Sequence, residues 1–277
     1  ATCWQLTAPL PGKLAAGEYR VCVHNGFGGK LGWSDGGTVK VAAPETWPAQ
    51  VFNVKDYGAR GDGSPGDDAC VRAALDKAAA NGGGVVYLPA GRYQLGSTLT
   101  IPKYVVLRGE RTDRVALLWP DNDDPYTLIE GTDHFGLEDL TIYGSNYVNV
   151  IAGSIGQPDS GHTFLRKVRV RADLYRGHLK TEQVDERLRA SMKRSTGGGD
   201  TVRLGGENVE ITDCDLYGSG RSLYLLRARG ARVTGNTFYN GRWGWYCLDG
   251  SDGLVLEHNR ILGADLMSTG GSLNCYT

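Results

Sequence analysis

The sequence predicts an all-β fold, a right-handed parallel β-helix with an N-terminal capping helix and a short N-terminal β-hairpin segment. Three observations predict it. Five segments repeat one apolar pattern at a nearly constant spacing, and a helical segment precedes them. The 277 residues also include 41 glycines, a content that favours a fold with many tight turns.

The five repeated segments share an apolar-x-apolar-x-x-small-x-apolar pattern. Their second apolar positions, the anchors, are 28, 46, 22 and 23 residues apart. A period near 23 is one coil of a solenoid, and 46 is one coil plus an insertion. We therefore expect stacked coils of three parallel strands from about residue 98 to residue 265. The anchors are Leu137, Leu165, Ile211, Val233 and Leu256.

A second periodic feature lies just after the anchors. Asn236 and Asn259 occupy the same point of successive repeats, and Cys214 stands in register one repeat earlier. Asn tolerates the left-handed backbone of a sharp turn, and stacked Asn side chains can hydrogen-bond along a solenoid. Asp213 and Asp215 flank Cys214, so we place them at this turn and reject them as a catalytic pair.

Residues 1–46 read as a separate β segment. Apolar and polar residues alternate over 19–24, a glycine-rich turn follows, and a second strand is predicted over 38–41. GEYRVCVHNG followed by GWS resembles the last hairpin of an immunoglobulin-like module. The predicted domains are a partial immunoglobulin-like segment over 1–46 and the β-helix over 47–277.

A capping helix is predicted over about residues 69–80, with Asp67 or Asp68 as its N-cap and Asn81 and Gly82 at its end. The segment VFNVKDYGARGDGSPGDDACVRAALDKAAANGGGVVYLPAGRY resembles the N-terminal cap and first coil of the pectate-lyase-like β-helix superfamily. That superfamily includes polysaccharide lyases, polygalacturonase-type hydrolases and phage tailspikes. The resemblance implies the fold but no particular reaction, because this motif builds a cap and not an active site.

In families of this fold the catalytic groove runs along the third strand of each coil, predicted here over 201–204, 223–226 and 245–248. The loop before the first of these strands is expanded to about 171–199 and contains a predicted amphipathic helix over about 181–194. Asp249 and Asp265 are the predicted catalytic carboxylates. Aromatic rings that can stack on sugars, and basic groups that can hold carboxylates, are the predicted substrate-binding residues. They are Arg203, Arg221, Tyr224, Arg242, Trp243, Trp245, Tyr246, His178 and Lys180.

Each of these residues also has a structural interpretation. The arginines could offset nearby aspartates, some of the aromatic rings could fill the core, and His178 could be structural. The predicted helix over 181–194 could be a solvated surface helix or a flap over one end of the groove.

We predict a carbohydrate-active enzyme, secreted or at the cell surface or periplasm, that cleaves a polysaccharide as a glycoside hydrolase. The NTD, DD and GHG signatures of polygalacturonases are absent from the sequence. One alternative is a polysaccharide lyase, which needs a base and either Arg or Ca²⁺ to neutralise a uronate carboxylate. Ca²⁺ ligands could then come from Asp121, Asp123 and Asp124. The other alternative is a non-catalytic carbohydrate-binding or adhesive β-helix.

Charge and composition limit the partners. Lys and Arg number 30 against 31 Asp and Glu, so nucleic acid is not the expected partner. No apolar run is long enough to span a membrane. Six scattered cysteines leave disulfide pairing open. One further period from Leu256 passes the end of the chain, so we expect another chain or a missing C-terminal segment to complete the solenoid.

Overall fold

The computed structural model describes residues 14–41, 43, 45–120, 124–153, 160–173, 182, 186, 199–218, 220–239, 243–248, 250–262 and 273–275. The chain forms two compact units, residues 1–46 and 47–277. In the first unit, β1 (Gly17–His24) and β2 (Trp33–Val41) pair as an antiparallel hairpin. A short 3-10 helix, Gly29–Gly32, precedes β2. The relation of this hairpin to an immunoglobulin-like module stays a prediction.

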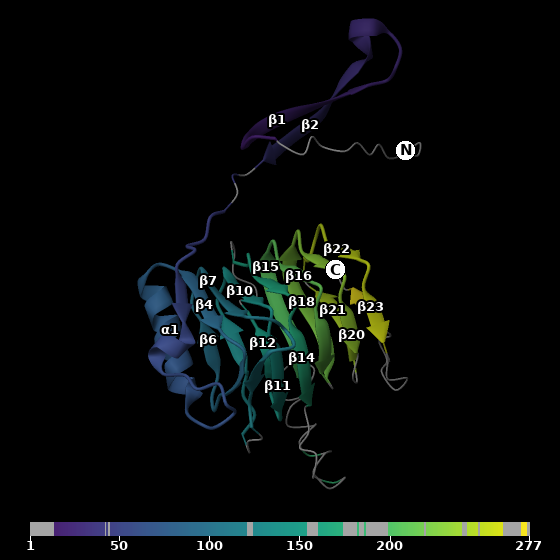
Figure 1. Ribbon diagram of the computed structural model, residues 1–277. Coiled ribbons are helices and arrows are strands. Elements are labelled where there is room, and N and C mark those ends of the chain that lie inside the picture. Colours follow the sequence, from purple (N-terminus) through teal and green to yellow (C-terminus); the bar gives the residue numbers. More distant parts are fainter. Residues whose placement is uncertain are drawn as a thin grey trace. The chain divides into compact units, whose positions relative to one another are not determined.

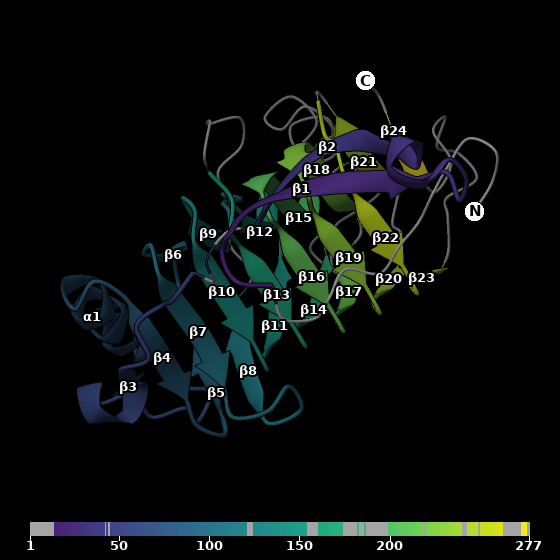
Figure 2. The ribbon, with the colours of Figure 1, turned by 90° about the horizontal axis from the view of Figure 1, so that it is seen from above.

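The second unit is a parallel β-helix of three sheets, with every strand hydrogen-bonded to its counterpart in the next coil (Figures 1 and 2). The first sheet contains β3 (Val51–Asn53), β4 (Gly84–Leu88), β7 (Val105–Gly109), β10 (Phe135–Glu138), β13 (Phe164–Arg166), β16 (Glu210–Thr212), β19 (Arg232–Thr234) and β22 (Val255–Glu257). The second contains β5 (Gly91–Gln94), β8 (Val115–Leu118), β11 (Thr141–Ser145), β14 (Arg169–Asp173), β17 (Asp215–Gly218), β20 (Thr237–Tyr239) and β23 (Arg260–Leu262). The third contains β6 (Leu99–Ile101), β9 (Ile129–Gly131), β12 (Asn149–Ala152), β15 (Asp200–Glu207), β18 (Arg221–Arg229), β21 (Trp243–Leu248) and β24 (Leu273–Cys275).

The predicted period is confirmed by the register of the first sheet. Leu137 pairs with Leu165, which pairs with Ile211, and the row continues through Val233 to Leu256. The row also extends toward the N-terminus, where Leu137 pairs with Leu107. Leu107 in turn pairs with Val86 of β4, and Val86 with Phe52 of β3, so the stack begins earlier than the predicted residue 98. The predicted third strands are confirmed in position, but β15 and β18 run several residues longer than expected.

The inside of the coils is a stack of apolar side chains, because alternate residues of a strand point to opposite faces. Leu137, Leu165, Ile211 and Val233 are fully buried. Gly136 shows how tight the stacking of coils is on the outer face. A Cβ there would lie 2.2 Å from the ring of Phe164 in the next coil, so a larger residue would displace that ring.

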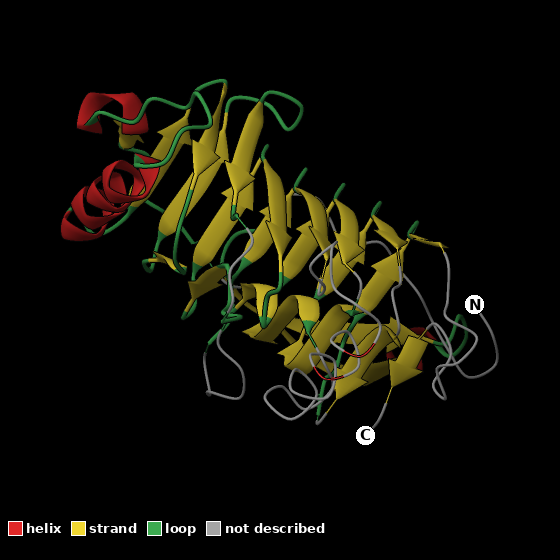
Figure 3. Ribbon diagram, turned by 90° about the horizontal axis from the view of Figure 1, so that it is seen from below, coloured by secondary structure: helices red, strands yellow, loops and turns green. Residues whose placement is uncertain are grey.

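The helix α1 (Asp67–Ala80) covers the N-terminal end of this core, as the sequence predicts (Figure 3). Its apolar face, which includes Val71 and Leu75, packs against β3 and β4. The predicted N-cap was wrong. Gly66 is the N-cap, at φ 116°, and no side chain caps the helix. The buried carboxylate of Asp67 instead accepts hydrogen bonds from the backbone N–H groups of Arg60 and Gly61, at 2.7 and 3.0 Å.

The asparagine stack is confirmed between the first and second sheets. Asn236 Oδ1 accepts from the Cys214 N–H at 2.8 Å, and Asn236 Nδ2 donates to Ile211 O at 2.8 Å and to Asn259 Oδ1 at 3.0 Å. One detail of the prediction was wrong. The left-handed residue is the one before each Asn position, Asp213 or Gly235 for example, which leaves the Asn side chain free to point inward and stack.

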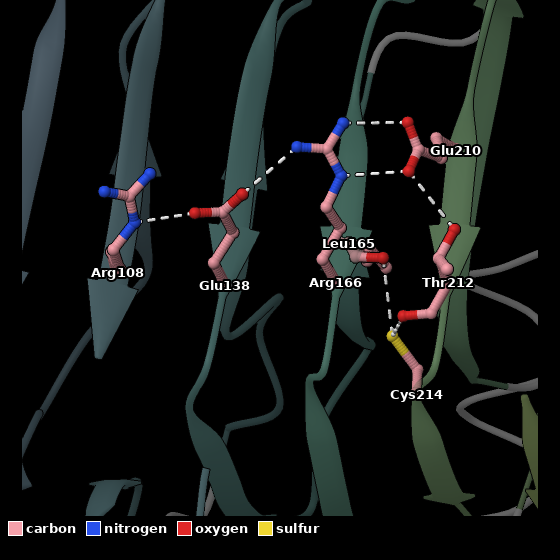
Figure 4. Close-up of polar contacts among 7 residues, drawn as sticks. All are labelled: Arg108, Glu138, Leu165, Arg166, Glu210, Thr212 and Cys214. Atoms are coloured by element: carbon pink, nitrogen blue, oxygen red, sulfur yellow. Dashed lines mark hydrogen bonds and ion pairs between the residues drawn. The ribbon is translucent and has the colours of Figure 1, made fainter. Parts of the chain in front are cut away.

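Alternating charges line the outer face of the first sheet (Figure 4). Glu138 joins Arg108 at 2.6 Å to Arg166 at 3.2 Å, and Arg166 forms a two-point contact with Glu210 at 2.8 and 2.9 Å. The hydrogen bonds from Arg166 hold the pKa of Glu210 below its ordinary value. Each charge thus meets an opposite charge from the next coil, which favours this order of coils over a slipped one.

The thiol of Cys214 is buried beside two strands of the first sheet, β13 and β16. It donates to Thr212 O at 3.3 Å and to Leu165 O at 3.5 Å, and burial raises its pKa to about 12. Cys22, Cys70 and Cys214 are free thiols. A membrane-crossing helix is not found among the described residues.

Replacing Asn236 with Ala should destabilise the fold by about 3 kcal/mol, because the Cys214 N–H and the Ile211 carbonyl would lose their partner inside the core. Urea unfolding of the variant measures the loss. Glu257→Ala is the control, since Glu257 is exposed at the end of β22 in the first sheet and its loss should cost little. Equal losses in the two variants would contradict a structural role for the stack.

Acid should weaken the contact between Arg166 and Glu210. The pKa of Glu210 is lower in the folded than in the unfolded chain, so its contribution is complete above the ordinary value of 4.5 and disappears as the pH falls through the lowered pKa. Because both side chains are partly exposed, we expect an effect of about 1 kcal/mol or less. The free energy of unfolding at neutral and acidic pH should fall less for Glu210→Gln than for the unmodified chain, whereas Glu257→Gln should leave the fall unchanged.

Candidate functional site

Polar residues occupy the first position of three neighbouring strands of the third sheet. Asn149 pairs with Asp200, and Asp200 pairs with Arg221, in three successive coils. Asn149 Nδ2 donates to Thr127 Oγ1 at 3.2 Å, and Asn149 Oδ1 accepts from the Asp200 N–H at 3.4 Å. Coil stacking therefore brings side chains together that lie far apart in the sequence.

Asp200 is the centre of a cluster of charges. Its carboxylate is fully buried, and Arg221, which is 3% exposed, reaches both of its oxygens, with Nε at 2.5 Å and Nη2 at 3.1 Å. Arg203 Nη1 lies 2.9 Å from Asp200 Oδ2. The two guanidinium groups stand 4.2 and 4.3 Å from the ring centre of Tyr224. Among the described residues two cations share this one anion, so these residues carry one positive charge in excess.

The excess charge resides chiefly on Arg203. Arg221 is committed to Asp200 by two hydrogen bonds, whereas Arg203 makes one, and a guanidinium has five N–H donors. The Arg203 side chain is also the more exposed, at 18%. Arg203 can therefore bind a carboxylate of a ligand by donating two parallel hydrogen bonds, while Asp200, Arg221 and Tyr224 hold the Arg203 side chain in place.

The outer row of the third sheet adds a carboxylate. Thr100, Glu130, Ala152, Arg203 and Tyr224 occupy one register position in five successive coils. Glu130 is exposed, and its Oε1 accepts from Thr100 Oγ1 at 3.4 Å. The small Ala152 separates Glu130 from Arg203 by two strand spacings, about 10 Å. The row continues in the backbone to Tyr246 and Asn274.

The structure brings three of the predicted substrate-binding residues together, Arg203, Arg221 and Tyr224. The structural interpretation of the arginines, that they offset nearby aspartates, also holds for Arg221, because Arg221 forms an ion pair with Asp200. The sequence reasoning missed Asp200 and Glu130. The signal for Asp200 was available, because it stands at the start of a predicted third strand, just after a glycine run, in register with Arg221.

Other predicted residues lie outside the described part of the chain. They are Asp249, Asp265, Arg242, His178 and Lys180, together with most of the predicted helix over 181–194 and residues Asp121 and Asp123. Trp243, Trp245 and Tyr246 are described in backbone only, in β21, where they pair with Arg221, Leu223 and Tyr224.

The rejected pair lies away from the third sheet. Asp213 is a left-handed turn residue between β16 and β17. Asp215 lies in β17 of the second sheet, where its carboxylate forms an ion pair with Arg171.

The described residues around Asp200 do not fit a calcium ion. Ca²⁺ takes six to eight oxygen ligands, and both oxygens of Asp200 already accept from guanidinium groups. A positively charged cluster repels a cation and attracts a carboxylate. Calcium binding elsewhere in the protein stays a prediction.

Removing Arg221 should be far more harmful to stability than removing Arg203. Arg221→Ala leaves the fully buried Asp200 without its two-point partner and should cost about 3–5 kcal/mol. Arg203→Ala removes one hydrogen bond at the edge of the cluster and should cost about 1.5 kcal/mol. Urea unfolding of both variants tests this order, and a larger loss for Arg203→Ala would show that the cluster is held together differently.

Comparisons with known proteins agree with this architecture. Residues 51–163 match the family described as rhamnogalacturonase A/epimerase, pectate lyase-like. The chain is 33% identical to mannuronan C5-epimerase AlgE1 of Azotobacter vinelandii over 142 residues, which are 46% of this chain and 10% of that protein. It is 36% identical to alginate lyase 7 of the same organism over 108 residues, 34% of this chain and 13% of that protein. The chain thus spans only about a tenth of the length of these relatives.

Solved structures support the fold. The A-module of the Azotobacter vinelandii mannuronan C-5 epimerase AlgE6 superposes with a TM-score of 0.62 at 22% identity, covering 77% of this chain and 56% of that one. At this identity the likeness shows the fold alone. Together with the three parallel sheets and the capping helix, it shows that the chain has the pectate-lyase-like parallel β-helix fold.

Proposed function

We propose that this chain is part of an enzyme that removes the proton next to the carboxylate of a uronate residue in an acidic polysaccharide. The observation that carries the proposal is the positively charged cluster of Asp200, Arg203, Arg221 and Tyr224 on the third sheet. The relatives named above support it, since they are mannuronan C5-epimerases and an alginate lyase. The glycoside hydrolase expected from the sequence is not confirmed, and these relatives fit the lyase alternative better.

The chemistry explains why the cluster fits. A proton α to a carboxylate is weakly acidic, because its removal places a second negative charge beside the first. A guanidinium bound to that carboxylate stabilises the charge as it develops. Arg203 supplies this contact. Asp200 and Tyr224 position Arg203, so the cation is already in place before the charge develops.

Two outcomes follow from the same intermediate. If a proton returns to the opposite face of the carbon, the sugar is epimerised and no bond of the chain is broken. If instead the C–O bond at the neighbouring carbon breaks, the electron pair left by the C–H bond forms a C=C bond. The glycosidic oxygen leaves with the electron pair of the C–O bond and takes up a proton, so the polysaccharide is cleaved. The described residues support the shared first step, and the assay below separates the two outcomes.

The test incubates the purified protein with mannuronate and galacturonate polymers in deuterated water. Epimerisation incorporates deuterium at the reacting carbon without cleavage, and elimination gives unsaturated uronates that absorb in the ultraviolet. New reducing ends without ultraviolet absorbance would instead establish a hydrolase. Binding without any chemical change would establish an adhesive β-helix, and either result would refute the proposal.

Arg203→Ala should lower kcat by about 100-fold, because it removes a contact that strengthens in the transition state. Arg203→Lys should recover part of the rate, since it restores the charge without the two-point geometry. Arg232→Ala is the matched control, an exposed arginine of the first sheet, and should leave kcat unchanged. An unchanged kcat in Arg203→Ala would remove Arg203 from the mechanism.

A further inference from the structure

The outer face of the second sheet carries two rows of side chains that take no part in the site on the third sheet. The residues between the rows, such as Tyr93, Ile142, Val170 and Leu216, are fully buried, so alternation places both rows on the outside. The first, the basic row, is Arg92, Ala116, Thr141, Arg169, Asp215, Thr237 and Arg260. The second, the tyrosine row, is Gln94, Leu118, Tyr143, Arg171, Tyr217, Tyr239 and Leu262.

The tyrosine row exposes aromatic faces to solvent. Tyr143 is 43% exposed and Tyr217 is 40% exposed. Tyr217 and Tyr239 meet edge to face with ring centres 6.0 Å apart, and the Arg171 guanidinium stands 5.7 Å from the Tyr239 ring. These contacts hold the Tyr217 and Tyr239 rings in place. Tyr143 lies two strand spacings from Tyr217, about 10 Å, a length that a short stretch of sugar chain can bridge.

A hollow of about 330 Å³ opens beside Tyr143 at the N-terminal end of the row. One wall is the loop 110–114 between β7 and β8, which is longer than the corresponding turns 139–140 and 167–168. Thr112 of that loop donates to Lys167 O, and Thr141 donates to Thr112 O, each at 2.6 Å. The wall is therefore fixed to the sheet across two coils.

The hollow is basic. Arg92, Arg114 and Arg169 line it, against Asp113, whose charge is neutralised by Arg111. Arg114 is paired with Glu110 at 3.2 Å, and Arg169, whose Nε stands 3.6 Å from Asp215 Oδ2, shares that carboxylate with Arg171. Among the described residues no carboxylate forms an ion pair with Arg92. The lining therefore has positive charge available for an anionic ligand.

We propose that the second sheet is a separate binding surface for an acidic polysaccharide. Sugar carboxylates bind Arg92 and Arg169 in the hollow, and sugar rings stack on Tyr143, Tyr217 and Tyr239. Rows of arginine and tyrosine at the coil spacing suit a polymer with a regular repeat of charge and ring better than a folded protein. The inference rests on the proposed function only for the choice of a uronate polymer as ligand.

The experiment measures binding of a mannuronate oligosaccharide of defined length by calorimetry, using the full chain with Arg203→Ala to weaken the contact on the third sheet. In that background, Arg92→Ala and Tyr143→Ala should each raise Kd by about tenfold. Tyr143→Phe keeps the ring and should bind nearly as well as the parent. Arg232→Ala, on the first sheet, is the arginine control and should leave Kd unchanged. Thermal unfolding of each variant confirms that it is folded.

Two probes test the ligand class. A neutral glucan oligosaccharide of the same length should bind much more weakly, and so should polyglutamate, which has the carboxylates without the rings. The proposal fails if either probe binds as tightly as the uronate, or if Arg92→Ala and Tyr143→Ala leave Kd unchanged.

Turnover separates this inference from the proposed function. Arg92→Ala and Tyr143→Ala, made in the otherwise unmodified chain, should leave kcat on short oligosaccharides unchanged. If the uronate polymers are not altered at all but calorimetry gives the expected pattern, the proposed function fails and the binding surface stands. If they are altered and the second-sheet variants bind normally, the binding surface fails and the proposed function stands.

Discussion

Register between successive coils is the constraint on which the structure depends. Each strand of the β-helix pairs only with its counterparts in the coils before and after it, so a residue always meets the same two neighbours. Apolar residues form one continuous core, and the side chain of Asn236 can satisfy the backbone of the coil before it. A shift by one residue would turn the core side chains outward. The stack is therefore stable in one register only.

The same register gives the three outer faces different characters. On the first sheet, arginine and glutamate alternate, and their charges cancel from coil to coil. On the third sheet, two arginines converge on the single carboxylate of Asp200, and a positive charge is left over. On the second sheet, tyrosines and arginines stand in exposed rows. The two proposed binding surfaces lie where a row departs from self-neutralisation.

Much of the fold could be predicted from the sequence because its signals repeat. The anchor residues and the asparagine stack recur at one period, and the capping helix begins only two residues before its predicted start. The helix N-cap was mispredicted because the carboxylate of Asp67 binds the backbone of the preceding turn instead of capping the helix. That partner is set by tertiary packing and has no local sequence signal.

The candidate site was harder to predict. Asp200 is buried because Asn149 and Arg221 flank it, and Asn149 lies 51 residues earlier in the chain. A long insertion between these coils hides the spacing, so the row is visible only once the strands are paired. The rows of the second sheet were missed for a similar reason, since the coils that build them differ in length.

The connections between β14 and β15 and between β17 and β18 have a consequence for how such proteins diversify. The first spans residues 174–199 and the second only 219–220, yet both deliver their strands to the same register. Lengthening this corner of a coil leaves the stack unchanged. Descendants of one β-helix can therefore exchange whole loops and acquire new substrate preferences by insertion and deletion, while the scaffold is inherited intact. Selection on the core and selection on the loops act on separate stretches of sequence, which lets a family keep its fold while its specificities diverge.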